Sequence, residues 1–213
     1  SLTPEKLKGR DTTLLKEMLD GASGKLDTLR DHPEAGARMQ ETIGLTYLAM
    51  SENASAQKQL HGALEKRQQV LGGDHPDTLR SMRQLAVVFK EQGRHAEAES
   101  LLRQTLEKQQ RVLGPEHPDT FVTITVLAAV CEAQDRPWDS EMMLMQLWKL
   151  QKRVLGPDHL ETLATIGNVG ALLSRQGRHA EAVEMRHEHL NAARRVHGAR
   201  HLQTVVSMTI TAE

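Results

Sequence analysis

Apolar residues along the chain follow the spacing of helix faces, and the whole pattern returns every 42 residues. In one such stretch Leu85 and Ala86 lie four and three positions before Phe89, the spacings of neighbours on one face of a helix. Each period predicts a helix, a short turn, a second helix and then a longer loop. A pattern copied at a fixed period predicts an all-α solenoid of antiparallel helix pairs.

The loop between one pair of helices and the next carries the clearest repeat. Residues 70–79, 112–121 and 154–163 share the pattern Val-Leu-Gly-x-acid-His-x-acid-Thr, 42 residues apart each time. An eroded copy lies at 196–205, and an earlier copy at 31–34 is displaced by one residue. Glycine suits the left-handed residue that ends a helix, and the acid and threonine after histidine offer oxygens to cap the next helix. We interpret these loops as junctions between repeats.

The period divides the chain into a series of predicted units. Gly93 and Gly177 mark the turn inside two of the repeats, and the small residues Ala98 and Ala182 follow where two helices would approach closely. The expected boundaries are an N-terminal capping helix at 1–30, repeats at 31–72, 73–114, 115–156 and 157–198, and the truncated first helix of a fifth repeat at 199–213. Because that last helix stops before its partner, we expect the chain to be a fragment of a longer protein.

Small and large residues at fixed spacing give the repeat a family likeness. The set comprises Leu85, Ala86, Phe89 and Ala98 in one repeat and Ile43, Gly44, Tyr47 and Ala56 in another. This pattern resembles the packing positions of a tetratricopeptide repeat (TPR), and the period and the L-G-P-x-H-P-D-T loop resemble its kinesin light chain form. The resemblance implies one right-handed superhelix over residues 1–213. A HEAT or armadillo array has a similar period but does not account for this spacing.

The N-terminal stretch resembles the entry to the repeat region of large bacterial signalling proteins such as serine/threonine kinases. The resemblance rests on residues 9–20, 31–34 and 42–49. It implies a longer protein in which a kinase domain and a membrane segment precede the repeats. The sequence itself holds no Gly-rich loop, no His-Arg-Asp run and no Asp-Phe-Gly run, so kinase chemistry is not expected from this segment.

Composition argues against several kinds of partner. Lys plus Arg number 27 and Asp plus Glu 28, so no net field favours nucleic acid or an anionic membrane. Two Trp, one Tyr and two Phe leave few rings for base stacking. No run approaches the roughly 18 to 20 apolar residues of a membrane span. We expect a soluble segment without nucleic-acid or membrane contact, cytoplasmic unless a membrane segment precedes it in the full protein.

Histidine and cysteine are the candidate reactive groups, and neither pattern favours a catalytic or metal site. One histidine recurs at the same loop position, with copies about 10 Å or more apart, too far for one ion; the copies are His32, His75, His117, His159 and His201. His187 and His189 are two residues apart, which turns them to different sides of a helix. Cys131 aligns with the aromatic core position and should be buried. We predict no enzyme activity, no metal and no cofactor.

The likeness to tetratricopeptide repeats implies where a ligand would bind. In that fold the first helix of each repeat lines a concave groove. The implied inward positions are Arg38, Glu41 and Leu45, then Arg80, Arg83, Val87 and Lys90, then Val122, Thr125, Ala129 and Glu132, and last Ala164, Gly167, Asn168, Ala171, Ser174 and Arg175. One end is basic and the other small and plain, which suits an extended protein or peptide segment with acidic residues near the basic end. A solvated face without a ligand is the alternative.

The third repeat departs from the others. Residues 135–138 replace the Gly-Arg turn, and the helix that follows is apolar almost all round through residues 142–150. A surface helix normally shows a single apolar stripe. Either neighbouring repeats cover the extra apolar side chains, or Met142, Met145 and Trp148 form a contact surface for a partner or a second copy.

Two functions therefore stay open. The first is a protein-interaction scaffold, which binds a polypeptide segment in the groove as part of a larger signalling protein. The alternative is a self-association or structural module of a receptor-like kinase, which would use the third repeat's second helix to form a homodimer.

Overall fold

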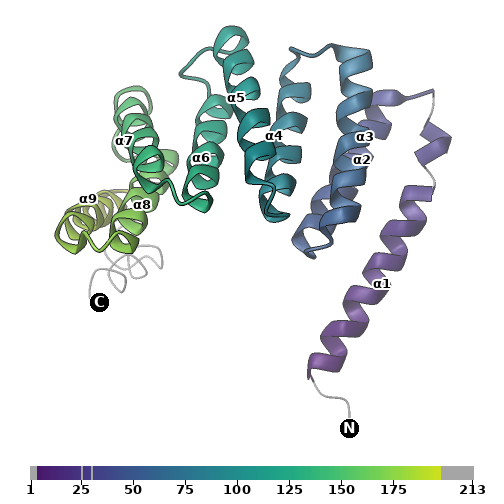
Figure 1. Ribbon diagram of the computed structural model, residues 1–213, viewed down its shortest axis with the longest axis horizontal. Coiled ribbons are helices and arrows are strands. Elements are labelled where there is room, and N and C mark those ends of the chain that lie inside the picture. Colours follow the sequence, from purple (N-terminus) through teal and green to yellow (C-terminus); the bar gives the residue numbers. More distant parts are fainter. Residues whose placement is uncertain (1–3, 25, 30, 198–213) are drawn as a thin grey trace. The chain divides into compact units, whose positions relative to one another are not determined.

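All regular secondary structure in the described part of the chain is helical. The computed structural model describes residues 4–24, 26–29 and 31–197, and these residues contain no strand (Figure 1). The prediction of an all-α helical repeat is confirmed. The predicted first helix of a fifth repeat, at 199–213, lies outside the described residues. The chain divides into two compact units, Ser1–Val112 and Leu113–Glu213.

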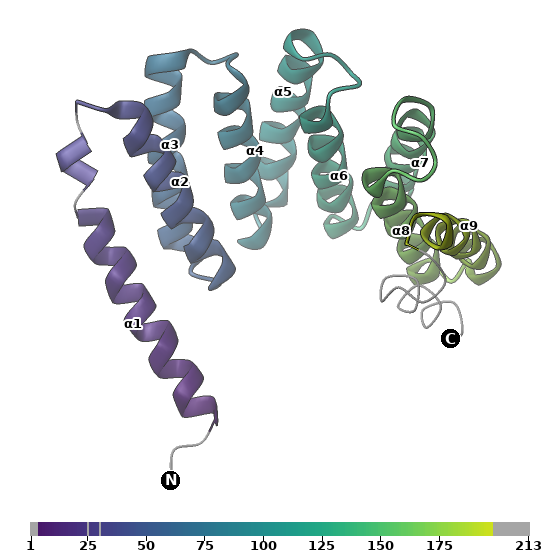
Figure 2. The ribbon, with the colours of Figure 1, turned by 180° about the vertical axis from the view of Figure 1, so that it is seen from behind.

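The first unit consists of a long N-terminal helix, a short 3-10 helix and two helix pairs (Figure 2). Helices α2 and α3 pack as one pair and α4 and α5 as another, and α3 also packs against α4. Tyr47, Leu60 and Leu79 come from three different helices and are buried in one shared core. The elements are α1 (Pro4–Gly24), η1 (Leu26–Leu29), α2 (Pro33–Ala49), α3 (Asn53–Leu71), α4 (Pro76–Glu91) and α5 (His95–Val112).

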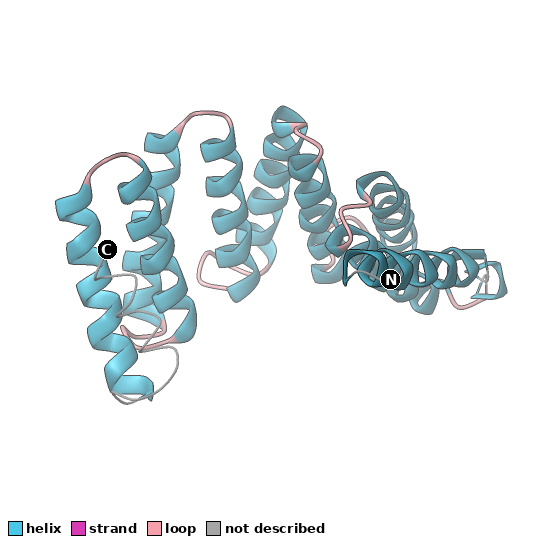
Figure 3. Ribbon diagram, turned by 90° about the horizontal axis from the view of Figure 1, so that it is seen from below, coloured by secondary structure: helices cyan, strands magenta, loops and turns pink. Residues whose placement is uncertain are grey.

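The described residues of the second unit, 113–197, form two further helix pairs. Short loops join the helices (Figure 3). Helix α6 packs with α7 and α8 with α9, and α7 also packs against α8. Ala128, Leu144 and Val169 again bring three helices into one core. The elements are α6 (Pro118–Ala133), α7 (Pro137–Val154), α8 (Leu160–Arg175) and α9 (His179–His197).

Small residues let the two helices of a pair come close together. A side chain at Gly44 would place its first carbon 2.7 Å from Cγ of Leu60 on the facing helix, closer than two carbons can lie. The equivalent residue of the next repeat, Ala86, is fully buried, and so is Ala98 of its partner helix. The predicted close approach at these positions is confirmed.

The loops between pairs end each second helix with a left-handed glycine. Gly72 has a φ of 87°, a conformation that is costly for a residue with a side chain. Thr78 donates its hydroxyl to the Gly72 carbonyl at 2.8 Å, which closes the loop. The other copies repeat both features: Gly114 and Gly156 have φ of 93° and 95°, and Thr120 and Thr162 donate to them at 2.9 Å. The prediction of a glycine cap is confirmed.

In the three loops between helix pairs the histidine, rather than the acid or the threonine, caps the next helix, whereas His32 at the start of α2 makes no such bond. His75 Nδ1 accepts a hydrogen bond from the backbone N–H of Asp77 at 3.2 Å. His117 and His159 accept equivalent bonds at 3.1 and 3.2 Å. The prediction that acid and threonine oxygens cap the helix was wrong, because both residues already lie inside its first turn and the threonine hydroxyl turns back to glycine. The recurring histidine thus shapes the loop.

An ion pair repeated in each loop joins it to the second helix of the following pair. The acid just before the loop histidine meets an arginine 37 residues further on, so the contact has the same register each time. The pairs are Asp74 with Arg111 at 2.6 Å, Glu116 with Arg153 at 2.9 Å, and Asp158 with Arg195 at 2.5 Å. The side chains of all three pairs are exposed, so solvent screens them and each adds little to stability.

The turn inside each repeat also needs a left-handed residue. Ser51, Gly93, Asp135 and Gly177 occupy the same position in successive repeats, with φ of 61°, 74°, 59° and 74°. Glycine adopts this conformation without steric cost, whereas serine and aspartate do not. The third repeat therefore holds Asp135 in a strained turn.

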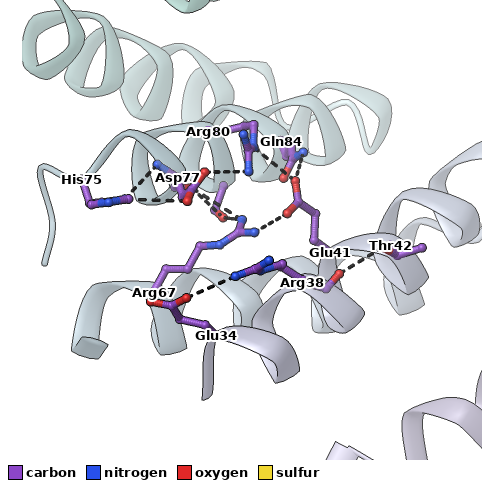
Figure 4. Close-up of polar contacts among 10 residues, drawn as sticks. Glu34, Arg38, Glu41, Thr42, Arg67, His75, Asp77, Arg80 and Gln84 are labelled. Atoms are coloured by element: carbon purple, nitrogen blue, oxygen red, sulfur yellow. Dashed lines mark hydrogen bonds and ion pairs between the residues drawn. The ribbon is translucent and has the colours of Figure 1, made fainter. Parts of the chain in front are cut away.

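A buried ion pair links the first repeat to the second (Figure 4). Arg67 on α3 is 3% exposed, and its guanidinium donates to Glu41 on α2 and to Ser81 on α4. Gln84 on α4 donates to the other oxygen of Glu41 at 2.6 Å. Burial by itself raises the pKa of the Glu41 carboxyl, but the hydrogen bonds from Arg67 and Gln84 outweigh burial and hold this pKa below its usual value.

Replacing Asp135 with glycine should stabilise the protein by about 1 kcal/mol, because the left-handed turn no longer strains a side chain. The matched control is Gly93→Asp, which introduces the same strain into the second repeat and should destabilise by a similar amount. Urea unfolding monitored by circular dichroism checks both. A lower unfolding midpoint for Asp135→Gly would contradict the role given to this turn.

Replacing Glu41 with glutamine should destabilise the first unit by about 3 kcal/mol, because Arg67 then stays buried without a counter-charge. Since folding lowers the Glu41 pKa, the ionised carboxylate stabilises the fold above the ordinary pKa of 4.5, and this contribution is lost as the pH falls through the folded-state pKa. Urea unfolding at a series of pH values should therefore show an acid destabilisation that is weaker in Glu41→Gln. Glu34→Gln, which removes an exposed pair, should cost less than about 1 kcal/mol; equal costs would contradict the buried link.

Candidate functional site

The candidate binding residues are the predicted groove positions of the first helices, which are α2 and α4 in the first unit and α6 and α8 in the second. Positions 42 residues apart take equivalent places in their repeats, so Arg38, Arg80, Val122 and Ala164 form one such set. We call the side chains at the groove positions predicted above the first-helix face. Its two halves belong to different units, and each has its own geometry.

The half in the first unit is crowded with ion pairs (Figure 4). Arg80 Nη2 lies 2.7 Å from Asp77 Oδ1, and its Nε lies 3.5 Å from Glu41 Oε1. Arg38 Nη2 lies 3.2 Å from Glu34 Oε2. The Glu41 side chain is only 13% exposed, so it supports the face from beneath instead of presenting a free carboxylate to solvent.

A pocket of about 240 Å³ opens among these side chains, between α2, α3 and α4. Its lining is Glu34, Arg38, Arg67, Leu71, Asp77 and Arg80. Three guanidinium groups meet two carboxylates in the lining, and Glu41 adds a third carboxylate beside Arg67. Positive and negative side chains are therefore equal in number here, whereas the sequence analysis predicted a mainly basic end of the groove. The pocket offers forked hydrogen-bond donors, and a ligand carboxylate must compete with the protein's own acids for them.

The C-terminal half of α4 completes this part of the face. Arg83 and Val87 are half-buried. Lys90 is also half-buried, and its ammonium donates to Glu91 at 2.7 Å. The predicted basic stripe along α4 is therefore held within networks of the protein's own acids at Arg80 and at Lys90.

The half in the second unit is plain and little charged. Val122 is 41% exposed on α6, and the Thr125 hydroxyl is occupied by the backbone carbonyl of Phe121 at 3.1 Å. Asn168 on α8 is exposed. At the end of α8, Arg175 Nη2 reaches Glu132 Oε1 of α6 at 2.6 Å, which ties the first helices of successive repeats together. The exposed residues Ala164, Gly167 and Ala171 complete this half.

The second helix of the third repeat divides its apolar side chains between core and surface. Met145 is half-buried against the core of the second unit, and Trp148 is half-buried beneath the Lys152 ammonium, 4.8 Å from the ring centre. Met142 is 57% exposed and Trp138 67% exposed, and the Arg178 guanidinium lies 5.3 Å from the Trp138 ring centre. The exposed pair is thus Trp138 and Met142, of which only Met142 was among the predicted interface residues.

The other candidate groups have structural surroundings. Cys131 is fully buried. His189 is half-buried, and burial lowers the pKa of its imidazole. Within the described ranges, no three His, Cys, Asp or Glu side chains gather as a metal site would require. No helix of this part of the chain is both long and apolar enough to cross a bilayer.

Sequence reasoning missed several residues of the network. Asp77 and Glu34 precede Arg80 and Arg38 by three and four residues, a spacing that brings side chains together on a helix and was available as a signal. Arg67 had no such signal, because its contact with Glu41 crosses 26 residues and two helices. Only the folded chain brings them together.

Solved structures of other repeat proteins share this fold. The TPR-like repeats from Podosopora anserina, described as those of a kinesin light chain, match with a TM-score of 0.73 and 20% identity over 88% of this chain and 91% of that one. BtubC from P. vanneervenii matches with a TM-score of 0.74 and 16% identity, over 92% and 82% of the two chains. NprR in complex with its cognate peptide NprX matches with a TM-score of 0.64 and 15% identity, over 92% of this chain and 55% of NprR. These likenesses show the fold.

A family model identifies the repeat. No curated protein matches the chain by sequence. The tetratricopeptide repeat model matches residues 37–108, 90–150 and 161–213, which together span more than half of the chain. The matched stretches contain most of the four helix pairs seen in the structure. The chain therefore belongs to the tetratricopeptide repeat family.

Proposed function

We propose that this chain is a protein-interaction scaffold that holds an extended polypeptide segment against the first-helix face, as one part of a larger signalling protein. The observation that carries the proposal is the plain surface of α8. Ala164, Gly167, Asn168 and Ala171 share one side of the helix by their spacing, and all are exposed. Side chains this small let a peptide backbone approach the helix, and the Asn168 amide offers it both a donor and an acceptor.

Proteins of similar fold support this class of function. NprR was solved with its cognate peptide NprX, and a Rap protein was solved with Competence and Sporulation Factor. Their identities to this chain are only 15% and 12%. They therefore support peptide binding as a function of this fold, and the ligand of this chain must be inferred from its own residues.

At the other half of the face we infer a modest preference for acidic ligand residues. Arg38 is exposed and Arg80 is half-buried, and each already pairs with an acid of its own helix. A ligand carboxylate would exchange one exposed ion pair for another, which is worth about 1 kcal/mol or less. The preference should therefore be small and should weaken with added salt.

Peptides selected from a random display library against the whole chain provide the test. Asn168→Ala should weaken the binding of peptides held on α8 by about tenfold, because the ligand backbone loses a partner for its own polar groups. Asn191→Ala, the same change at an exposed position of α9, should have no effect. Arg38→Gln with Arg80→Gln should weaken acidic peptides by only about threefold. Fluorescence anisotropy measures all three, and full binding by both first-helix variants would contradict the proposal.

Self-association through α7 is a second candidate function, and one observation favours it. Trp138 and Met142 lie one turn apart on α7 and are both largely exposed, whereas a monomer gains nothing from such side chains in solvent. The partner would be a second copy of the chain, which forms a homodimer.

If α7 forms a dimer, light scattering should show a mass that rises with concentration, and Met142→Glu should abolish the rise because it places a charge in an apolar contact. Val183→Glu, on α9 and also exposed, is the matched control and should leave the mass unchanged. A monomeric mass at all concentrations for the unmodified chain would exclude this function.

A further inference from the structure

A polar cleft of about 820 Å³ lies outside the first-helix face, between the N-terminal helix and the first repeat. Helix α1 and η1 form one wall, and α2 and α3 form the other. Its volume falls in the range of known ligand sites, which is roughly 300 to 1,000 Å³. Such sites are usually mainly apolar. This cleft has apolar lining residues such as Leu26 and Leu29, but many of its side chains are polar, among them Asp20, Ser23, Gln40, Lys58, Gln59 and Lys66.

Two glutamines in the cleft stand where the next repeat has apolar core residues. Gln40 corresponds to Met82, and Gln59 corresponds to Leu101, each 42 residues further on. Met82 is 3% exposed and Leu101 packs against the core of the first unit. In the second repeat these positions are apolar and pack in the core. In the first repeat the same positions lie beside α1 and are polar.

The amide oxygens of these glutamines are buried and unpaired. Gln59 is only 6% exposed, and its Oε1 and that of Gln40 have no hydrogen-bond partner. The Gln59 Nε2 donates to Ser23 Oγ at 3.0 Å, and that hydroxyl donates to the Leu19 carbonyl at 2.8 Å. A buried carbonyl oxygen without a donor is unfavourable, so each amide gains a hydrogen bond if it turns its oxygen into the cleft toward a bound N–H group.

The backbone of the first repeat makes room for these side chains. A side chain at Gly62 would place its first carbon 2.6 Å from Gln40 Nε2, so the glycine leaves space for that amide. In the same way the Lys66 ammonium lies 3.2 Å from where a side chain of Gly36 would begin. The absence of side chains at Gly36 and Gly62 thus keeps polar groups along the cleft wall.

The charge of the cleft favours an anionic group. Lys58 and Lys66 line it, and neither makes an ion pair within the part of the chain that the structure describes. Asp20 is the only acid among the described lining residues, and its carboxylate accepts a hydrogen bond from the Tyr47 hydroxyl. The lining therefore combines two lysines with two glutamines whose amide oxygens are unpaired.

We propose that this cleft is a second polypeptide-binding site, which takes an extended segment that carries a carboxylate. On binding, the Gln40 and Gln59 side chains turn their amide oxygens into the cleft to accept hydrogen bonds from the segment's backbone N–H groups, and Lys58 and Lys66 pair with its carboxylate. An extended peptide supplies both kinds of group at once, since its backbone N–H groups are free when it is not part of a sheet or helix. This site is independent of the first-helix face.

Gln40→Met combined with Gln59→Leu tests the proposal, because it gives the first repeat the apolar residues of the second. These residues fit the repeat, so the unfolding midpoint should stay the same or rise. Peptides selected from a random display library on the whole chain should include a class whose affinity falls at least about tenfold in this variant. Gln104→Leu, on the exposed side of α5, is the control and should bind like the unmodified chain.

Lys58→Gln with Lys66→Gln should weaken the same class of peptides and should reduce the salt dependence of their binding. Asn168→Ala should leave them unaffected, which separates the cleft from the first-helix face. If every selected peptide binds the glutamine variant as tightly as the unmodified chain, the cleft proposal is overturned. Peptides sensitive only to Asn168→Ala would overturn the cleft alone, and peptides sensitive only to the cleft variants would overturn the first-helix face alone.

Discussion

A helix pair of this protein cannot bury its apolar face alone, and the loop after each pair sets the direction in which the chain continues. The left-handed glycine, as at Gly72, ends one helix, and the threonine hydroxyl returns to its carbonyl. The histidine, as at His75, then caps the next helix. These bonds recur in three loops with distances that agree within 0.1 Å for each type. Packing of small residues such as Ala86 depends on this repeated geometry.

Because the loops and small residues carry the fold, the outward helix positions are free to vary. One set of equivalent positions reads Arg38, Arg80, Val122 and Ala164, from charged to small, with no change of helix geometry. In the first repeat, positions 40 and 59 can also vary and are glutamine, because they lie beside α1 and not against a preceding repeat. The scaffold and its chemistry thus reside in different residues, as is common for repeat proteins.

The features that sequence predicted well are those set by local geometry. A period of 42 residues, a left-handed glycine at Gly72 and a buried core position at Cys131 each follow from a rule about one helix or one turn. The helix cap was predicted on the wrong residue, because histidine is a less common cap than aspartate or threonine. The balance of charge around Arg80 was underestimated, since the role of Glu41 depends on Arg67 from another helix.

The polar cleft beside α1 was not predicted at all. Glutamine at positions 40 and 59 gives no sign in sequence of whether its amide is solvated or buried. The distinction depends on how α1 lies against the first repeat, a tertiary property that no period reveals. The predicted likeness to bacterial signalling proteins stays a prediction.

Hydroxyl-radical footprinting of the chain with a library-selected peptide tests most directly whether the first helices hold the ligand. Leu45 on α2 and Val122 on α6 are 39% and 41% exposed, and Val70 on α3 and Val183 on α9 are 46% and 39% exposed, so the two sets start equally accessible. Our account predicts that the peptide protects Leu45, Val122 or both and leaves Val70 and Val183 unchanged. Protection confined to Val70 and Val183 would contradict it, because the ligand would then lie on the second helices.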